Sequence, residues 1–176
     1  YNRTLTRLEI IIALLISGVE YNPGPDISNL EIITINCNGL TSNIRLLQAV
    51  GKIKKQIKFN QAIIFLQETH NTNIVLLESI WNGPINISTG TGGSRGVITL
   101  CTSETETIAF KADTEGRYLF TTIKIGDNKF INTANIYSPN DHVVSKAFFD
   151  NTINDWELFC EDQTCALPHD QQSLFV

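Results

Sequence analysis

Three apolar runs along the chain each end in a short polar string, and this arrangement constrains the fold more than any other feature. Residues 31–35, 62–66 and 130–136 have the length and β-branched character of buried strands. The strings that follow them are Asn-Cys-Asn-Gly-Leu at 36–40, Gln-Glu-Thr-His at 67–70 and Tyr-Ser-Pro-Asn at 137–140. An α/β sandwich assembles one site from loops at distant strand ends. We therefore expect the three strings to share one edge of the protein.

Hydrophobic periodicity predicts the other elements. Leu46, Val50, Ile53 and Ile57 recur at helical spacing in a helix expected at 43–58. Further helices are expected at 72–81 and 144–159, and no periodicity is evident from residue 160 onward. Strands are expected at 30–36, 62–67, 85–88, 95–101, 107–112, 117–125 and 129–137. This order predicts an α/β fold with two sheets packed face to face and helices outside.

Composition sets modest bounds on function. The 176 residues carry a net charge of -5, so the chain has no overall basic field to attract nucleic acid. A phosphate ligand would need a metal ion or a few local Arg and Lys residues. The four cysteines match neither a zinc site nor a dense disulfide framework, which favours an intracellular protein, nuclear or cytoplasmic. The apolar run at 10–16 is too short to span a bilayer, so no membrane association is expected.

The strand-ending strings contain residues suited to phosphate chemistry. Glu68 ends an apolar run, so its carboxylate is expected at the rim of the core, where Mg²⁺ could bind it together with a substrate phosphate. Asn36 could orient a phosphate oxygen or a water molecule. Tyr137 could donate to a phosphate oxygen, and Pro139 would stiffen the loop that presents Asn140. Taken singly, each residue also fits a solvated strand end or an ordinary turn.

Together the strings resemble one family. The segment 30–40, Gln-Glu-Thr-His at 67–70 and Asn-Ile-Tyr-Ser-Pro-Asn at 135–140 are similar, in order and approximate spacing, to the endonuclease/exonuclease/phosphatase superfamily. The likeness is greatest to the apurinic-type endonuclease domain of non-LTR (LINE-type) retrotransposons and covers about residues 30–149. It implies a deoxyribonuclease I-like two-sheet sandwich that nicks DNA with Mg²⁺ or Mn²⁺, and a reverse transcriptase domain in the full-length parent.

The resemblance also implies roles for individual residues. Glu68 would bind the metal, Asn36 would support the metal and the scissile phosphate, and Tyr137 and Asn140 would contact the phosphate or hold the site together. Arg95 may be expected to contact the DNA backbone, or to be an ordinary surface residue after the Gly-rich turn. His70 is interpreted as structural, since the family's catalytic His lies elsewhere.

The sequence lacks several strings that the family's active site uses. It has no Gly-Asp-Phe-Asn string and no terminal Ser/Asp-His pair, and Pro-His-Asp at 168–170 has the reverse order. Residues 26–149 are therefore interpreted as the N-terminal part of the domain and 150–176 as an unmatched acidic tail, with one sheet expected to be largely missing. Because catalytic groups that act as a unit are lost together, activity is expected to be impaired. An inactive interaction remnant and a phosphomonoesterase or phosphoinositide phosphatase are the alternatives.

The N-terminal segment has a separate resemblance. Residues 17–25 read Ser-Gly-Val-Glu-Tyr-Asn-Pro-Gly-Pro after the apolar run, and this is similar to the ribosome-skipping peptides of some viruses and retrotransposons. The resemblance implies that the bond between Gly24 and Pro25 is not formed during translation. Gly18 stands where those peptides usually have Asp. A Pro/Gly-rich linker at 1–25 is the alternative.

Overall fold

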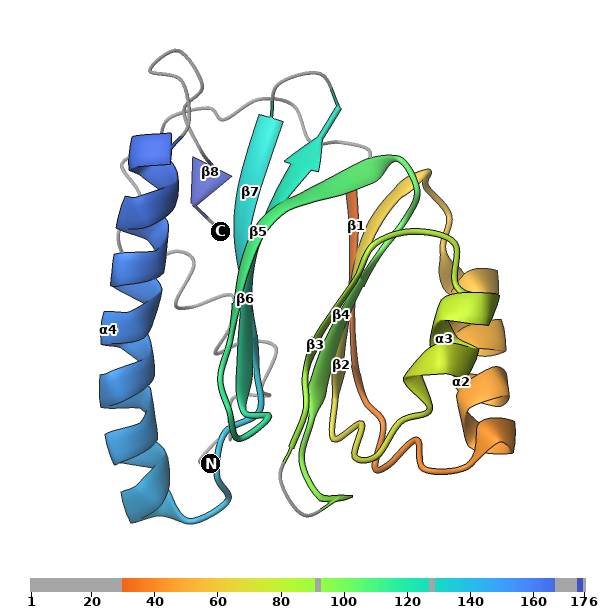
Figure 1. The fold of residues 1–176 in the computed structure, drawn as a ribbon, viewed down its shortest axis with the longest axis horizontal. Coiled ribbons are helices and arrows are strands. Elements are labelled where there is room, and N and C mark those ends of the chain that lie inside the picture. Colours follow the sequence, from red (N-terminus) through yellow and green to blue (C-terminus); the bar gives the residue numbers. More distant parts are fainter. Residues whose placement is uncertain (1–29, 91–92, 127–128, 167–173, 176) are drawn as a thin grey trace, which may run out of the picture.

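The protein is a four-layer arrangement in which two β-sheets pack face to face between helices. The computed structural model describes residues 30–90, 93–126, 129–166 and 174–175. Helices α2 and α3 cover the outer face of one sheet and α4 covers the outer face of the other (Figure 1). The predicted α/β sandwich is therefore confirmed.

The first sheet, sheet A, contains β1 (Leu30–Asn36), β2 (Gln61–Gln67), β3 (Ile85–Ser88) and β4 (Val97–Cys101). Their order is β1-β2-β4-β3, with β1 parallel to β2 and the other neighbours antiparallel. Parallel pairing sends the ends of β1 and β2 to the same edge of the sheet. This places the first two polar strings side by side.

The second sheet, sheet B, is an antiparallel meander with a short added strand. It contains β5 (Thr105–Ala112), β6 (Tyr118–Ile125), β7 (Lys129–Ile136) and β8 (Leu174–Phe175), in that order. Strand β8 runs parallel to β7 and pairs only with Ile131 and Asn132. The expectation that one sheet would be largely missing is wrong, because each sheet has four strands among the described residues.

Helix α2 (Asn43–Gln56) forms where the periodicity predicts it. The Ser42 hydroxyl accepts a hydrogen bond from the Arg45 amide at 3.2 Å and so caps the helix N-terminus. The helix buries Leu46, Val50 and Ile53 against side chains on the outer face of sheet A. Burying three aliphatic side chains of this size contributes roughly 1.5–3 kcal/mol each. Helix α3 (Ile74–Ile80) adds Leu77 to the same core.

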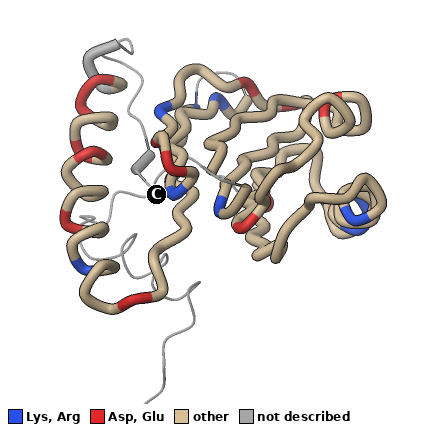
Figure 2. The backbone as a smooth tube through the Cα atoms, turned by 60° about the horizontal axis from the view of Figure 1, so that its bottom comes forward, with Lys and Arg blue, Asp and Glu red and all other residues tan. Residues whose placement is uncertain are grey.

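Helix α4 (His142–Ala166) is longer than the periodicity predicts. It continues past residue 159 and runs unbroken across the proposed boundary at 149/150. Phe159 and Cys160 pack with Phe120 of β6, whose ring lies 5.1 Å from that of Trp156. Polar residues on the outer face of α4 hide this contact from a search for periodicity. Figure 2 shows that α4 is mostly acidic, whereas α2 carries Lys and Arg.

The two sheets meet through an apolar core that becomes polar toward one end. Ile63 and Phe65 of β2 pack against Ile123 and Ile131 of sheet B. Further along, threonine, glutamine and asparagine side chains fill the same interface and are also buried. These are Gln67, Thr99, Thr121, Thr133 and Asn135. The polar end of this interface is the end at which β1, β2 and β7 finish.

Two simpler expectations can be compared with the structure. Cys101 is buried as expected, whereas Cys37 is only half-buried. None of the helices in the described ranges is long and apolar enough to cross a bilayer. The apolar run at 10–16 and the string at 17–25 lie outside the described residues.

Candidate functional site

The structure brings Asn36 and Glu68 into direct contact. Asn36 is the last residue of β1, and Glu68 follows the last residue of its parallel neighbour β2. The Asn36 side-chain amide donates to Glu68 Oε1 at 2.7 Å, and Asn36 Oδ1 accepts from the Asn38 amide at 3.0 Å. Both functional groups of Asn36 are thus used to fix its orientation and that of the carboxylate.

The backbone at this edge has an unusual conformation. Four non-glycine residues have left-handed φ angles: Asn38 at 47°, Glu68 at 53°, His70 at 55° and Arg95 at 68°. Such residues cost about 1 kcal/mol or more each and persist only where surrounding contacts hold them. Here the Glu68 carbonyl accepts from the Gly39 amide at 2.7 Å, and the His70 amide donates to the Arg95 carbonyl at 2.6 Å. Strained backbone of this kind is typical of functional sites.

Gly96 and Gly116 join the two sheets at the same edge. The Gly96 amide donates to the Gly116 carbonyl at 3.1 Å, and the Gly96 carbonyl accepts from Thr69 at 3.0 Å. Gly116 has a φ of +69°, and a Cβ on it would lie 2.5 Å from the Gly90 nitrogen. Only glycine allows this approach of backbones, so the position of sheet B relative to Glu68 depends on it.

Tyr137 pairs with a residue that the sequence search did not select. Its amide donates to the Arg117 carbonyl at 2.7 Å, and the Arg117 guanidinium lies 5.3 Å from the centre of the Tyr137 ring. Arg117 Nη1 also donates to the Tyr137 carbonyl at 3.4 Å. Among the described residues, the guanidinium makes no hydrogen bond to a carboxylate. Partial burial and the nearby charge of Arg95 lower the pKa of Arg117, which nevertheless stays cationic at neutral pH.

Arg95, in contrast, has a carboxylate partner. Its guanidinium forms an ion pair with Glu115, and the two side chains are 31% and 62% exposed. The pair neutralises Arg95 locally, so the charge available to a phosphate at this edge comes chiefly from Arg117. Asn140 is an exposed residue of the segment between β7 and α4.

A buried hydrogen-bond network lies beneath these residues. Gln67 Nε2 donates to Asn135 Oδ1 at 2.8 Å across the interface between the sheets. The Asn135 amide group donates in turn to the Ile98 carbonyl at 3.0 Å. Gln67 and Asn135 are 8% and 1% exposed. These two residues flank the predicted site residues in their strings, but a single sequence contains no signal that they meet.

The donor set determines what kind of metal ion could bind. Among the described residues there is no group of three or more His, Cys, Asp or Glu side chains that could hold a metal ion. Burial, reinforced by the charge of Glu68, raises the pKa of the Cys37 thiol to about 12, so this neighbour stays protonated at neutral pH. A single carboxylate oriented by an amide does not suit zinc. It fits Mg²⁺ or Mn²⁺, which keep several waters and bind substrate phosphate directly.

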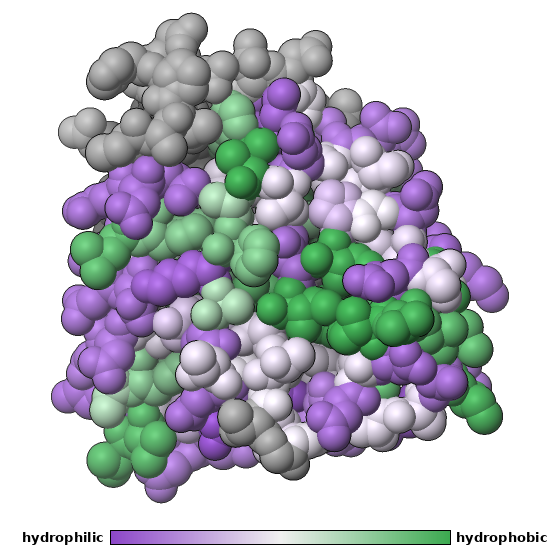
Figure 3. Space-filling view, in the orientation of Figure 1, coloured by the Kyte–Doolittle hydropathy of each residue, from purple (hydrophilic) through white to green (hydrophobic). Residues whose placement is uncertain are grey.

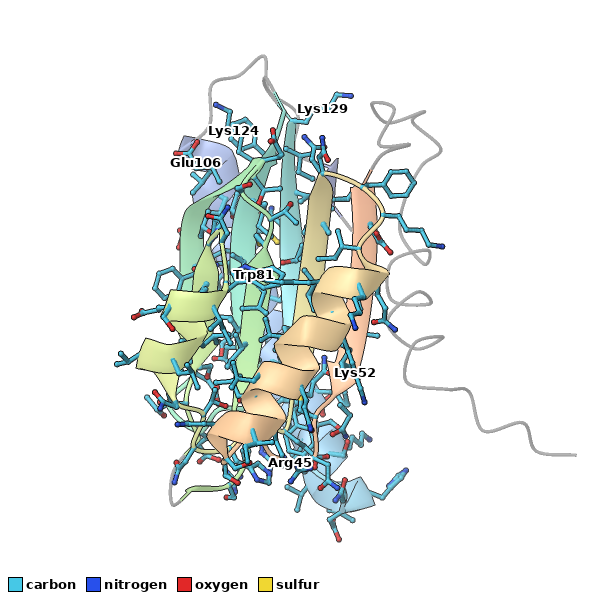
Figure 4. All side chains as sticks on the ribbon, turned by 90° about the vertical axis from the view of Figure 1, so that its right-hand side faces the viewer. Arg45, Lys52, Trp81, Glu106, Lys124 and Lys129 are labelled. Carbon is cyan, nitrogen blue, oxygen red and sulfur yellow. The ribbon has the colours of Figure 1, made fainter. Side chains whose placement is uncertain are left out.

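A depression elsewhere on the surface does not coincide with these residues. It is lined by Lys54, Phe59, Trp81 and Glu104, among others. These residues lie where β2 begins and β4 ends, at the opposite end of sheet A. Figure 4 shows Trp81 beneath α2, and Arg45 at the other end of that helix, where it donates to the Asn38 carbonyl at 3.1 Å. The strand ends therefore remain the candidate site.

Comparison with known proteins identifies the fold. The sequence matches no model of a protein family and no curated protein. Two solved structures of TDP2 from Caenorhabditis elegans resemble this one. The first gives a TM-score of 0.52 at 18% identity and the second, with selenomethionine, 0.51 at 17% identity. Each comparison covers 78% of this chain, but only 44% and 43% of the TDP2 chains. The chain thus shares the deoxyribonuclease I-like fold of TDP2 and spans less than half the length of those chains.

Proposed function

We propose that this chain is the N-terminal part of a metal-dependent DNA endonuclease domain of the endonuclease/exonuclease/phosphatase superfamily, in which Glu68 binds Mg²⁺ or Mn²⁺. The contact between Asn36 and Glu68 at adjacent strand ends carries the proposal. Two further observations support it. The fold is that of TDP2, which is a member of this superfamily. The strings that resemble the family also lie at the end of the sandwich where β1, β2 and β7 finish.

Each residue has a role in this proposal. Asn36 orients the Glu68 carboxylate through its amide and supports the scissile phosphate. The bound metal would neutralise charge on the phosphoryl oxygens. Tyr137 and Arg117 would hold a phosphate oxygen from the sheet B side of the site, and Asn140 would contact the phosphate from the following loop. Arg95 would reach the DNA backbone only if its pair with Glu115 opened.

Several finer proposals rest on the sequence resemblance. The parent protein would be a non-LTR retrotransposon protein with a reverse transcriptase domain, acting inside the cell in the nucleus or cytoplasm. The string at 17–25 would derive from a ribosome-skipping peptide. Reading the genomic DNA beyond codon 149 in all three frames tests the origin of the tail, because a Gly-Asp-Phe-Asn string there would identify a shifted frame.

A second candidate function follows from the missing groups. The sequence has no Gly-Asp-Phe-Asn string and no Asp-His pair of the kind that activates the attacking water in this family. Hydrolysis at phosphorus needs a base and charge stabilisation together. A chain that keeps Glu68 without these groups would bind metal and phosphate but turn over slowly. The second candidate is therefore a catalytically inactive binding remnant.

Replacing Glu68 with glutamine should weaken Mn²⁺ binding at least tenfold, equivalent to about 1.4 kcal/mol, because it removes the anionic ligand. Titration of Mn²⁺ by electron paramagnetic resonance measures the affinity. Glu78→Gln is the matched control, since Glu78 is an exposed residue of α3. Equal Mn²⁺ affinity in the wild-type and Glu68→Gln chains would refute the metal assignment.

Nicking of supercoiled plasmid with Mg²⁺ separates the two candidates. Nicking by the wild-type chain that is lost in Glu68→Gln identifies an endonuclease. Metal binding that depends on Glu68 without nicking identifies the inactive remnant. Metal-dependent release of phosphate from a phosphomonoester or phosphoinositide, with intact plasmid, would point to a phosphatase of the same superfamily.

Replacing Arg117 with glutamine should lower the salt dependence of duplex DNA binding by about 0.9 in the log–log slope, as expected for the loss of one phosphate contact. Fluorescence anisotropy across a salt series measures it. Lys124→Gln makes the same charge change at the opposite end of the sandwich and should leave the slope unchanged (Figure 4). The Arg95→Gln/Glu115→Gln double variant removes that ion pair without changing net charge and should also have little effect. A larger effect of the double variant would transfer the DNA-contacting role to Arg95.

A further inference from the structure

Strand β1 forms an open edge of sheet A. Among the residues that the structure describes, it pairs only with β2. Figure 4 shows β1 at the outer side of the sheet, beyond β2. Strand β2 packs against β7, so β1 lies over the outer side of β7, where β8 pairs with two residues only. As a result Ile32, on the face of β1 that is turned toward sheet B, is 48% exposed.

The backbone groups on this edge can be assigned by alternation. The Cys37 amide donates to the Gln67 carbonyl at 2.8 Å, so the odd-numbered residues of β1 direct their N–H and C=O groups toward β2. The even-numbered residues direct theirs away from the sheet. They are Leu30, Ile32, Thr34 and Asn36. The outward set is therefore spaced evenly along the whole strand.

This outward set is complementary to itself. When two copies of β1 run antiparallel about Ile33, Ile32 lies opposite Thr34 and Leu30 lies opposite Asn36 of the other copy. All four have outward backbone groups, and residues directly opposite each other then exchange both hydrogen bonds, as in a standard antiparallel ladder. The pairing uses all seven residues of the strand.

The side chains also permit this pairing. Glu31 is the one charged residue of β1, and the two-fold places it opposite Ile35, so no like charges face each other. Its Oε2 already accepts from the Lys58 amide at 2.8 Å. Natural edge strands usually avoid pairing by means of Lys, Pro or a bulge. Strand β1 contains no Lys or Pro, and its register with β2 is continuous.

We propose that a second copy of this chain pairs with β1, so that two copies form one continuous sheet across a two-fold axis at Ile33. The interface is the same surface on both copies, as in most homodimers. Because the strands are antiparallel, the two Asn36–Glu68 pairs lie at opposite ends of the joined sheet. The inference depends on the fold and not on whether Glu68 binds a metal.

The oligomeric state of the whole chain tests the proposal. Sedimentation velocity across a concentration series should show a dimer of the wild-type chain that dissociates on dilution. Ile32→Lys should shift the dissociation constant at least tenfold, because it places a charge on the edge. Since Ile32 is half-exposed, the fold accommodates the lysine, which circular dichroism checks. Val75→Lys makes the same change at a 78% exposed residue of α3 and should leave the dimer intact.

Other outcomes would overturn the proposal. Figure 3 shows that apolar side chains also gather on the face opposite β1, where Val75, Ile108 and Phe110 are exposed. A dimer broken by Val75→Lys but not by Ile32→Lys would use that face instead. A wild-type chain that is monomeric throughout the series would exclude pairing at β1. Hydrogen exchange gives a second measurement: the Ile32 and Thr34 amides should become protected as the concentration rises, and protection that is independent of concentration would contradict a second copy.

Discussion

Replacing Asn135 with alanine should lower the free energy of unfolding by about 3 kcal/mol. The substitution removes the acceptor of Gln67 Nε2 and the donor to the Ile98 carbonyl, both in the buried interface between the sheets. Buried polar groups left without a partner cost about 1–3 kcal/mol, and the lost volume adds to that. Urea denaturation measures the change. Asn151→Ala, at an exposed position on α4, should change stability by less than about 0.5 kcal/mol.

A double-mutant cycle separates the hydrogen bond from general packing. Gln67→Leu and Asn135→Leu should each be destabilising, because each leaves the other polar side chain without its partner. The double variant should cost less than the sum of the two, since replacing both partners with apolar groups avoids an unsatisfied donor. Additive effects, or an Asn135→Ala chain as stable as Asn151→Ala, would show that the network contributes little.

Replacing Gly116 with alanine should cost more than about 2 kcal/mol, since the residue has a positive φ and lies against backbone. The new Cβ would come within 2.5 Å of the Gly90 nitrogen and 2.8 Å of the Gly96 nitrogen. Neither neighbour can move without disturbing the Gly96–Gly116 hydrogen bond that joins the sheets. Thermal and urea denaturation measure the loss.

Gly51→Ala is the matched control for Gly116→Ala. Gly51 lies within α2, and a Cβ there would meet nothing within 4 Å. Alanine should therefore stabilise the helix by roughly 0.5–1 kcal/mol. Opposite signs for the two variants are expected. If Gly116→Ala were as stable as the wild type, the close approach at this edge would not be a constraint on the fold.

The sequence predicts much of the fold because most elements have a local signal. Helix α2 begins at the expected residue and ends two residues early, and every strand of sheet A lies within its expected range or one residue beyond it. The end of α4 and strand β8 were not predicted. The last turns of α4 are held by Phe159 and Cys160 against sheet B, and β8 exists only through its pairing with β7. Contacts made with distant residues leave no periodic pattern.

The candidate site was predictable in part for the same reason. Glu68 and Asn36 could be selected because each ends an apolar run, and parallel pairing then brings them together. Arg117 follows a glycine at the start of a strand and has no local feature that distinguishes it. Its importance comes from Tyr137, twenty residues away in the chain. The contact between Gln67 and Asn135 depends on how two sheets face each other, which one sequence does not encode locally.

The left-handed residues at the strand ends set heat resistance against chemistry at this edge. Glycine at position 68 would relax the backbone but delete the carboxylate, and glycine at 38, 70 or 95 would bring a similar relief. A selection for thermal stability alone should therefore accumulate glycines around Glu68. Variants recovered from such a selection would melt later and lose their affinity for divalent cations first.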